Sequence, residues 1–176
     1  MNSVKYIRYT LVLVLLIATT ACKKNYVKKS KLEGHSYTVE DVAVYYEMDY
    51  ETWKIQNPDG DIMEGGENVI SSTGYMNFEN TDESEVFFSM KYEWTDSGGY
   101  TSELDVSFTY QGMFYMYRDK ADAFIIRHSP NSLGVTNEDY FQVHEVNGNE
   151  IILLFNQVSL LNDPQAILYV AKVKKD

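Results

Sequence analysis

Residues 85–94, EVFFSMKYEW, alternate between two faces of an extended chain. One face would carry only apolar or aromatic side chains, namely Val86, Phe88, Met90, Tyr92 and Trp94. The opposite face would carry Phe87, Ser89, Lys91 and Glu93, which are mostly polar. A period of two is that of a β-strand, because successive side chains point to opposite faces of a sheet. The stretch therefore predicts a strand with one face in an apolar core.

The same alternation continues on the C-terminal side of this stretch. In LDVSFTY, residues 104–110, Leu104, Val106, Phe108 and Tyr110 share one face, and MFYMYR continues the pattern from Met113. Further short runs rich in aromatic and β-branched residues are DAFIIRH (122–128), YFQVHEV (140–146), EIILLFNQV (150–158) and AILYVAKVKK (166–175). These residue types favour strands, and no comparable run has a helical period.

Short turn sequences separate these runs. TDSGGY (95–100) and RDKAD (118–122) each lie between two predicted strands, and Asn147 with Gly148 suits a type I′ turn. Links of this length join neighbouring antiparallel strands. About eight to ten strands in succession predict an all-β, antiparallel up-and-down β-barrel, since closure hides the sheet edges. The 15 Tyr, eight Phe and two Trp residues of the chain are available to fill it.

Four segments of the chain resemble the lipocalin-like lipoproteins common in Bacteroidetes. They are LEGHSYTVEDV (32–42), TGYMNFENTDE (73–83), FTYQGMFYMYRDKADAFII (108–126) and DYFQVHEVNGNEIILLF (139–155). Leu32 and Gly34 match the family's opening motif, while Ser36 or Tyr37 stands where Trp is usual. The resemblance implies a single calycin-type barrel domain over residues 32–176.

An apolar run precedes this domain. Residues 11–24 read LVLVLLIATTACKK, and the polar stretch before them carries Lys5 and Arg8 but no acid. A membrane-spanning helix needs about 20 apolar residues, and this run is shorter. Residues 1–21 are therefore predicted to be a secretory signal peptide, with a short buried helix as the alternative.

The cysteine at the end of the run is the only one in the chain. Thr19, Thr20, Ala21 and Cys22 resemble the lipobox of bacterial lipoproteins, with Thr19 where Leu is usual. The resemblance implies cleavage after Ala21 and a diacylglycerol on Cys22, usually with a third acyl chain on its amine. Two or more chains anchor a protein stably in a membrane. The alternative is a free or structural thiol.

Charge divides the mature chain into two parts. Residues 22–31, CKKNYVKKSK, contain five lysines and no acid, and they form a basic tether. From Leu32 onward, eight basic and all 26 acidic residues give a net charge of −18. The tether would lie along anionic headgroups while the acidic domain is repelled by them. Nucleic acid is excluded as a partner on this charge.

The basic residues after Cys22 also bear on location. In the Bacteroidetes families that the chain resembles, an acidic run soon after the cysteine marks export to the cell surface. Lys23 and Lys24 stand there instead. We therefore expect a protein of the cell envelope that is held on the periplasmic side, at the outer membrane.

No pattern in the sequence indicates an enzyme. The three histidines, His35, His128 and His144, lack the spacing of a zinc site or of a nucleophile and its base. Pairs of carboxylates are too frequent among 26 acids to indicate a glycosidase. We expect no catalytic residue and no cofactor.

An acidic loop, NPDGDIMEGGEN at 57–68, is a weak metal-site hypothesis. Asp59, Asp61, Glu64 and Glu67 could supply oxygen ligands to Ca²⁺. Met63, however, stands where an EF-hand needs an oxygen ligand, so a solvated loop is the preferred interpretation.

Two functions follow from the barrel. The first is binding of a small hydrophobic ligand inside it, by the inward residues Met90, Tyr92, Trp94, Phe108 and Tyr115. The second is a non-catalytic interaction or assembly module of the cell envelope, with a filled core. The expected partners are the membrane, through acyl chains on Cys22, and this ligand.

Overall fold

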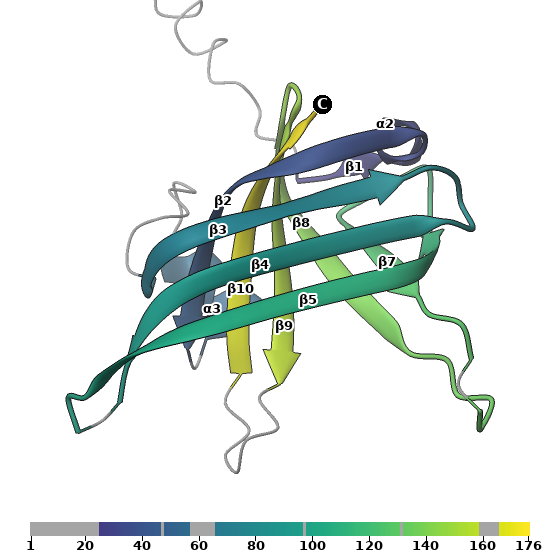
Figure 1. Cartoon of the computed structure of the whole chain (residues 1–176). Helices are drawn as coiled ribbons and strands as arrows, with labels where there is room; N and C mark the ends of the chain where they lie inside the picture. The colour runs from purple at the N-terminus through teal and green to yellow at the C-terminus, as the bar shows by residue number, and fades with distance from the viewer. Residues whose placement is uncertain (1–24, 47, 57–65, 97, 131, 159–165) are drawn as a thin grey trace, which may run out of the picture.

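Antiparallel strands dominate the computed structural model, which describes residues 25–46, 48–56, 66–96, 98–130, 132–158 and 166–176. Within these residues, eight strands close into a barrel in the order β10-β2-β3-β4-β5-β7-β8-β9, and β1 pairs with β6 in a separate small sheet (Figure 1). The predicted all-β, antiparallel up-and-down barrel is confirmed. The strands are β1 (Val27–Lys28), β2 (His35–Tyr46), β3 (Asn68–Phe78), β4 (Ser84–Thr95), β5 (Thr101–Tyr115), β6 (Lys120–Ala121), β7 (Ala123–Arg127), β8 (Glu138–Asn147), β9 (Glu150–Val158) and β10 (Ala166–Lys175). The helices are α2 (Lys29–Leu32) and α3 (Tyr50–Gln56).

Strand β4 behaves as its alternating sequence predicts. It pairs along its whole length with β5 and along most of it with β3. Its even-numbered residues are buried from Ser84 to Tyr92, and the residues between them are half-buried. Because every second side chain enters the barrel, this strand supplies a continuous row of apolar groups to the core.

Strand β5 is longer than any run predicted from the sequence. LDVSFTY and the first three residues of MFYMYR, Met113–Tyr115, lie on one unbroken strand of 15 residues, Thr101–Tyr115. All of its residues up to Gly112 pair with β4. On its other side, only Met113–Tyr115 pair, with residues 125–127 of β7. Most of β5 therefore projects beyond the short strand next to it.

The hairpin between β8 and β9 has its turn one residue later than predicted. Asn147 pairs with Glu150, so the two central residues are Gly148 and Asn149 rather than Asn147 and Gly148. Gly148 has a φ of 56°, which a glycine adopts without steric cost. Gly148 thus takes a left-handed position at this turn, and Asn147 remains part of the ladder.

Aromatic rings fill the middle of the barrel. The Phe124 and Phe141 rings stack with centroids 4.9 Å apart, and Phe155 stacks on Phe88 at 4.8 Å and on Tyr169 at 5.2 Å. Offset and edge-on contacts of this kind add to the burial energy of each ring. The rings come from strands on all sides of the barrel and make one core.

One end of the barrel is closed by the N-terminal segment. Val27 and Leu32 are 1% and 0% exposed and belong to the interior core. The Tyr37 hydroxyl donates a hydrogen bond of 2.6 Å to the Lys31 carbonyl, and Lys31 donates to the Gly148 carbonyl. This closed end also contains the β3–β4 turn and the β8–β9 hairpin (Figure 1).

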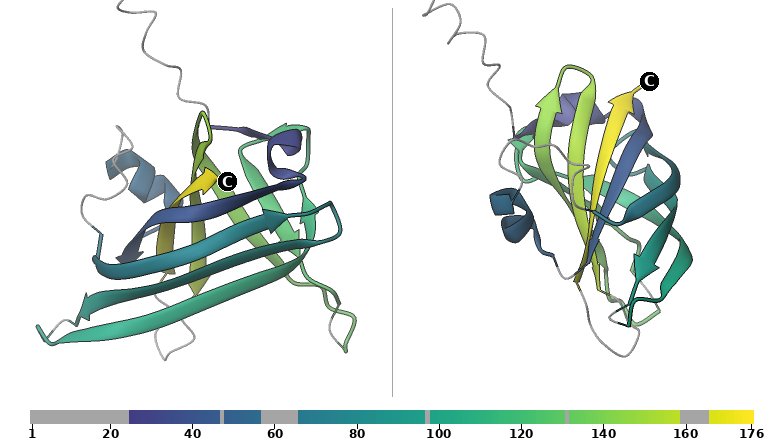
Figure 2. Two further views of the ribbon diagram at one scale, coloured as in Figure 1. Left: turned by 45° about the horizontal axis from the view of Figure 1, so that its top comes forward. Right: turned by 90° about the vertical axis from the view of Figure 1, so that its left-hand side faces the viewer.

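Helix α3 lies outside the barrel wall (Figure 2). Trp53 is fully buried there against the outward side chains of β2, β9 and β10, including Tyr45, Leu154 and Leu168. Asp49 caps the helix, since its carboxylate accepts the Thr52 N–H at 2.7 Å. The helix has seven residues and a single buried side chain, so its sequence shows no measurable period.

The opposite end of the barrel is less completely closed. Strand β8 pairs with β9 only from Gln142 to Asn147, so Glu138 to Phe141 have partners on β7 alone. Strand β7 in turn reaches only the last three residues of β5. The β7–β8 pair is thus bonded to its neighbours near the closed end and diverges from β9 beyond it (Figure 1). We call this second end the open end.

Candidate ligand-binding site at the open end of the barrel

Four of the five predicted lining residues share the inner face of the barrel. Met90 and Tyr92 are buried in the interior core, and Trp94 and Phe108 are half-buried against it. The sequence pattern located these side chains because β4 and β5 are regular over this length and pair residue by residue. The prediction of an inward position is confirmed for these four.

The prediction for Tyr115 is wrong. Its side chain is exposed, its ring contacts Tyr117 at a centroid distance of 5.4 Å, and Arg127 stacks over it at 5.3 Å. Phe108 and Tyr115 are seven residues apart on one unbroken strand, so they must point to opposite faces. Phe114, which is 0% exposed, occupies the inward position instead.

Burial falls steadily along β5 toward the open end. Phe114 and Tyr110 are buried, whereas Phe108, Val106 and Leu104 on the same face are only half-buried. The half-buried side chains lie on the part of β5 beyond Met113–Tyr115, the three residues that pair with β7. The half-buried side chains form an apolar surface on the inner wall, which we call the inner apolar surface. Its members are Tyr46, Val69, Trp94, Leu104, Val106 and Phe108.

Four of these members, Trp94, Leu104, Val106 and Phe108, follow from the alternation in β4 and β5, and Tyr46 and Val69 do not. Leu104 and Val106 share a face with Phe108 in the sequence, although the incomplete ladder that exposes them has no sequence signal. Tyr46 ends β2, whose four consecutive buried residues, Val42 to Tyr45, hide the period of two. These four are buried on both faces because α3 covers the outside of β2.

Three tyrosine hydroxyls form a chain beside the inner apolar surface. The Tyr46 and Tyr92 hydroxyl oxygens are 2.7 Å apart, and Tyr92 also hydrogen-bonds to Tyr169. Burial, followed by these contacts, raises the pKa of Tyr46 and of Tyr169 well above that of a free phenol, so these two stay neutral. Two bonds among three hydroxyls use two of three donors. One O–H and several lone pairs are thus left to contact a polar group of a ligand.

Glu67 adds a carboxyl group at the end of the tyrosine chain. Burial raises its pKa, and its charge in turn raises the pKa of Tyr46. The backbone N–H of Glu67 donates to the Val44 carbonyl at 2.8 Å, which fixes this residue beside the end of β2. The site therefore combines an apolar wall with a short run of hydrogen-bonding groups.

A groove opens on the outside where β8 leaves β9. It has a volume of about 430 Å³ and is lined by both strands, by Tyr50 of α3 and by Leu168 of β10. Phe155 lines it as well and also belongs to the interior ring cluster. The groove thus reaches the core at the point where the ladder is interrupted.

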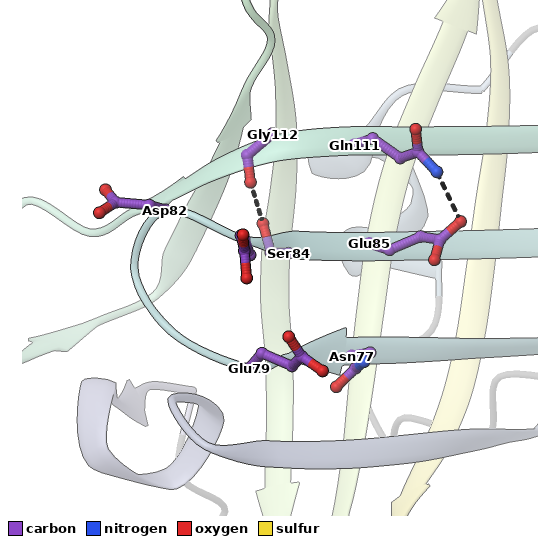
Figure 3. A pocket seen from close by; sticks show the side chains of 8 residues that line it. Asn77, Glu79, Asp82, Ser84, Glu85, Gln111 and Gly112 are labelled. Carbon is purple, nitrogen blue, oxygen red and sulfur yellow. Dashed lines mark hydrogen bonds between the residues drawn. The ribbon is translucent and has the colours of Figure 1, made fainter.

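A second groove, over the β3–β4 turn, differs in being acidic. It has a volume of about 370 Å³, and carboxylates of Glu79, Asp82 and Glu85 surround it (Figure 3). Ser84 donates to the Gly112 carbonyl at 2.6 Å, and Gln111 donates to Glu85 at 2.8 Å. Across the described part of the chain, no group of three or more His, Cys, Asp or Glu side chains is placed to hold a metal ion.

Several predicted residues lie outside the residues that the structure describes. They are Cys22, Asp59, Asp61 and Glu64, so the lipid-attachment and metal-site predictions stay predictions. No helix among the described residues combines the length and the apolar character needed to span a membrane. His128 pairs with Asp139, and His144 packs against Trp53 at a ring distance of 4.8 Å.

Comparisons with family models, with curated proteins and with solved structures found no match to this chain.

Proposed function

We propose that the protein is a lipid-anchored, lipocalin-like envelope protein that binds a small hydrophobic ligand at the open end of its barrel. One observation carries the binding proposal, namely the inner apolar surface. Its side chains face the barrel axis but are only half-buried, unlike the apolar side chains on the same strands at the closed end. Leaving such surface in water costs free energy, which an apolar ligand would recover.

The tyrosine chain restricts the chemistry of the ligand. The hydroxyls of Tyr46 and Tyr92 would accept or donate one or two hydrogen bonds, and the raised pKa of Tyr46 keeps its hydroxyl neutral. Glu67 nearby disfavours an anion. The best match is a neutral, largely apolar molecule with one hydroxyl or carbonyl group, since small-molecule sites combine apolar walls with few polar groups.

The anchoring proposal rests on the sequence alone. Acylation of Cys22 would hold the barrel at a membrane through the basic tether, on the periplasmic side of the outer membrane. The mass of the mature N-terminus, compared with that of a Cys22→Ser protein, tests the modification. A product that still begins at Met1 without acyl chains would contradict it, and protease digestion of the domain on intact cells would contradict the periplasmic placement.

Ligand binding is tested by native mass spectrometry of the protein extracted from its membrane. We expect a compound to co-purify with the unaltered chain and to be lost from Val106→Glu, which puts a charge on the inner apolar surface. Ser107→Glu is the matched control, because Ser107 is the next residue of β5 and is exposed on the outer face. Retention of the compound by both variants would contradict the proposed site.

The alternative function is an interaction module with a filled core. The stacked rings of Phe88, Phe155 and Tyr169 favour it, because they occupy the middle of the barrel and leave only the open end for a ligand. If no compound co-purifies with the unaltered chain, this function takes the place of ligand binding.

A further inference from the structure

Exposed tyrosines gather on one outer face of the barrel, away from the inner apolar surface. Tyr115, Tyr117 and Tyr140 are 39%, 73% and 53% exposed. Tyr117 and Tyr140 line one groove of about 440 Å³ together with Tyr26, which immediately precedes β1. These four tyrosines, with Arg118 and Lys120 between them in the same groove, define what we call the tyrosine face.

The tyrosine face also carries basic residues. Arg118, Lys120 and Arg127 are three of only eight basic residues from Leu32 onward in a domain of net charge −18. Lys120 stacks over the Tyr26 ring at 5.0 Å, and Arg127 stacks over Tyr115. Lys28 is exposed on β1 and pairs with Lys120 in the small ladder.

Four carboxylates lie beside the basic residues of this region. Glu138 binds Arg127 at 2.7 Å, and Asp139 pairs with His128. Asp119 and Asp122 lie in the same stretch as Arg118 and Lys120. In the described ranges, however, neither of these two basic side chains has a carboxylate within ion-pair distance.

The tyrosine face is also the part of the barrel that is joined to the tether. Val27 pairs with Ala121, and Asn25 lines the groove with Tyr117 and Tyr140. Asn25 is three residues after Cys22, and three residues span at most about 11 Å. A membrane that holds acyl chains on Cys22 would therefore lie within about 11 Å of Asn25 on this face.

We propose that the tyrosine face docks on the headgroup layer of the membrane that anchors the protein. Tyrosine is favoured at that depth because its ring is apolar and its hydroxyl is polar, and lysine and arginine contact anionic lipid headgroups there. The acidic remainder of the domain is repelled by the same surface, and the short connection from Asn25 to Cys22 selects this face over the others. The inference rests on the proposed acylation of Cys22, and it adds a defined orientation to it.

Hydroxyl-radical labelling of the full-length expressed protein tests the docking. Labelling is measured in isolated membranes and again after extraction into a mild detergent. We expect labelling of Tyr117 and Tyr140 to be several-fold lower in membranes than in detergent. Tyr75 and Tyr100, which are 41% and 77% exposed on β3 and in the β4–β5 turn, are the internal controls and should label equally in both.

Two charge-reversal variants test the electrostatic contribution to docking. Lys120→Glu should restore labelling of Tyr117 in membranes to its level in detergent, with the fraction of protein in the membrane unchanged. Lys54→Glu is the matched control, because Lys54 is also exposed and stacks over a tyrosine ring, Tyr50, at 5.6 Å. It should leave the labelling of Tyr117 low.

The outcomes separate docking from anchoring. If the protein is acylated but Tyr117 and Tyr140 label as strongly in membranes as in detergent, the docking proposal alone is overturned. Protection of Tyr117 and Tyr140 in both conditions would indicate a protein partner on this face and would also overturn it. If the protein carries no acyl chain and is found in the soluble fraction, both the anchoring proposal and the docking proposal are overturned.

Discussion

The two ends of this barrel are built from the same strands and the same alternating sequence, yet they differ in how completely apolar side chains are buried. At the closed end, Phe78 and Phe114 are 0% exposed, and the N-terminal segment covers them with Leu32. At the open end, Trp94 and Leu104 are half-buried, because the β7–β8 pair has diverged from β9 and β5 is paired with β4 on one side only. An inward direction is therefore a property of one strand, whereas burial depends on the strands beside it.

The largest expected effect compares a phenylalanine at the closed end with one at the open end. Phe78→Ala should lower the free energy of unfolding by about 3 to 5 kcal/mol, the usual cost of removing a fully buried ring. Phe108→Ala should cost less, about 1 to 2 kcal/mol, since part of that ring is already in water. Urea unfolding of both variants measures the difference. Equal losses would mean that the two ends are equally well packed.

A smaller effect is expected at Gly74, where the β2–β3 ladder ends. Its neighbour Tyr75 makes the last pair, with Thr38, and a Cβ on Gly74 would lie 2.3 Å from the Phe87 carbonyl oxygen and 2.9 Å from Val39 Cγ2. Gly74→Ala should lower the free energy of unfolding by about 1 to 3 kcal/mol, because backbone must move. Thr73→Ala, at the exposed neighbouring position, is the control. If the two variants were equally stable, the strands would not be as close as described.

The pH dependence of stability should report on the closed end. Burial raises the pKa of Tyr37 from 10.0 to about 12, so the folded state favours the neutral phenol. The stabilisation is fully present below pH 10.0 and is lost as the pH rises toward 12. Tyr37→Phe should reduce this decline, although Tyr46 and Tyr169 contribute to it as well. A profile unaffected by Tyr37→Phe would argue against burial of that hydroxyl.

The sequence predicts most of the barrel because apolar and polar residues alternate regularly along its longest strands. In β4 and β5 every second residue is apolar over many residues, and the ladder keeps that register. The turn after Thr95 was likewise expected from its glycines, and Thr95 pairs with Thr101. Prediction failed at Tyr115, where two separate runs were in fact one strand, and a shift of one residue reverses the face.

The candidate site could be predicted only in part. Trp94 and Phe108 follow from the alternation, but their partial exposure depends on the short length of β7 and on where β8 leaves β9. The hydroxyls of Tyr46 and Tyr92 are in contact although the two residues are 46 positions apart in the chain, and no local sequence pattern indicates such a contact. Helix α3 was missed for a similar reason, because Trp53 is its only buried side chain.

The central claim is that the inner apolar surface of the open end receives a ligand, and Trp94 is the natural reporter of it. The neutral apolar dye N-phenylnaphthylamine would be titrated into the protein while energy transfer from tryptophan is followed. Trp53, the other tryptophan, is 0% exposed under α3 on the outside of the barrel. The account predicts saturable transfer that falls strongly in Trp94→Phe and that Val106→Glu abolishes. Undiminished transfer in Val106→Glu, or no binding of the dye by the unaltered protein, would contradict it.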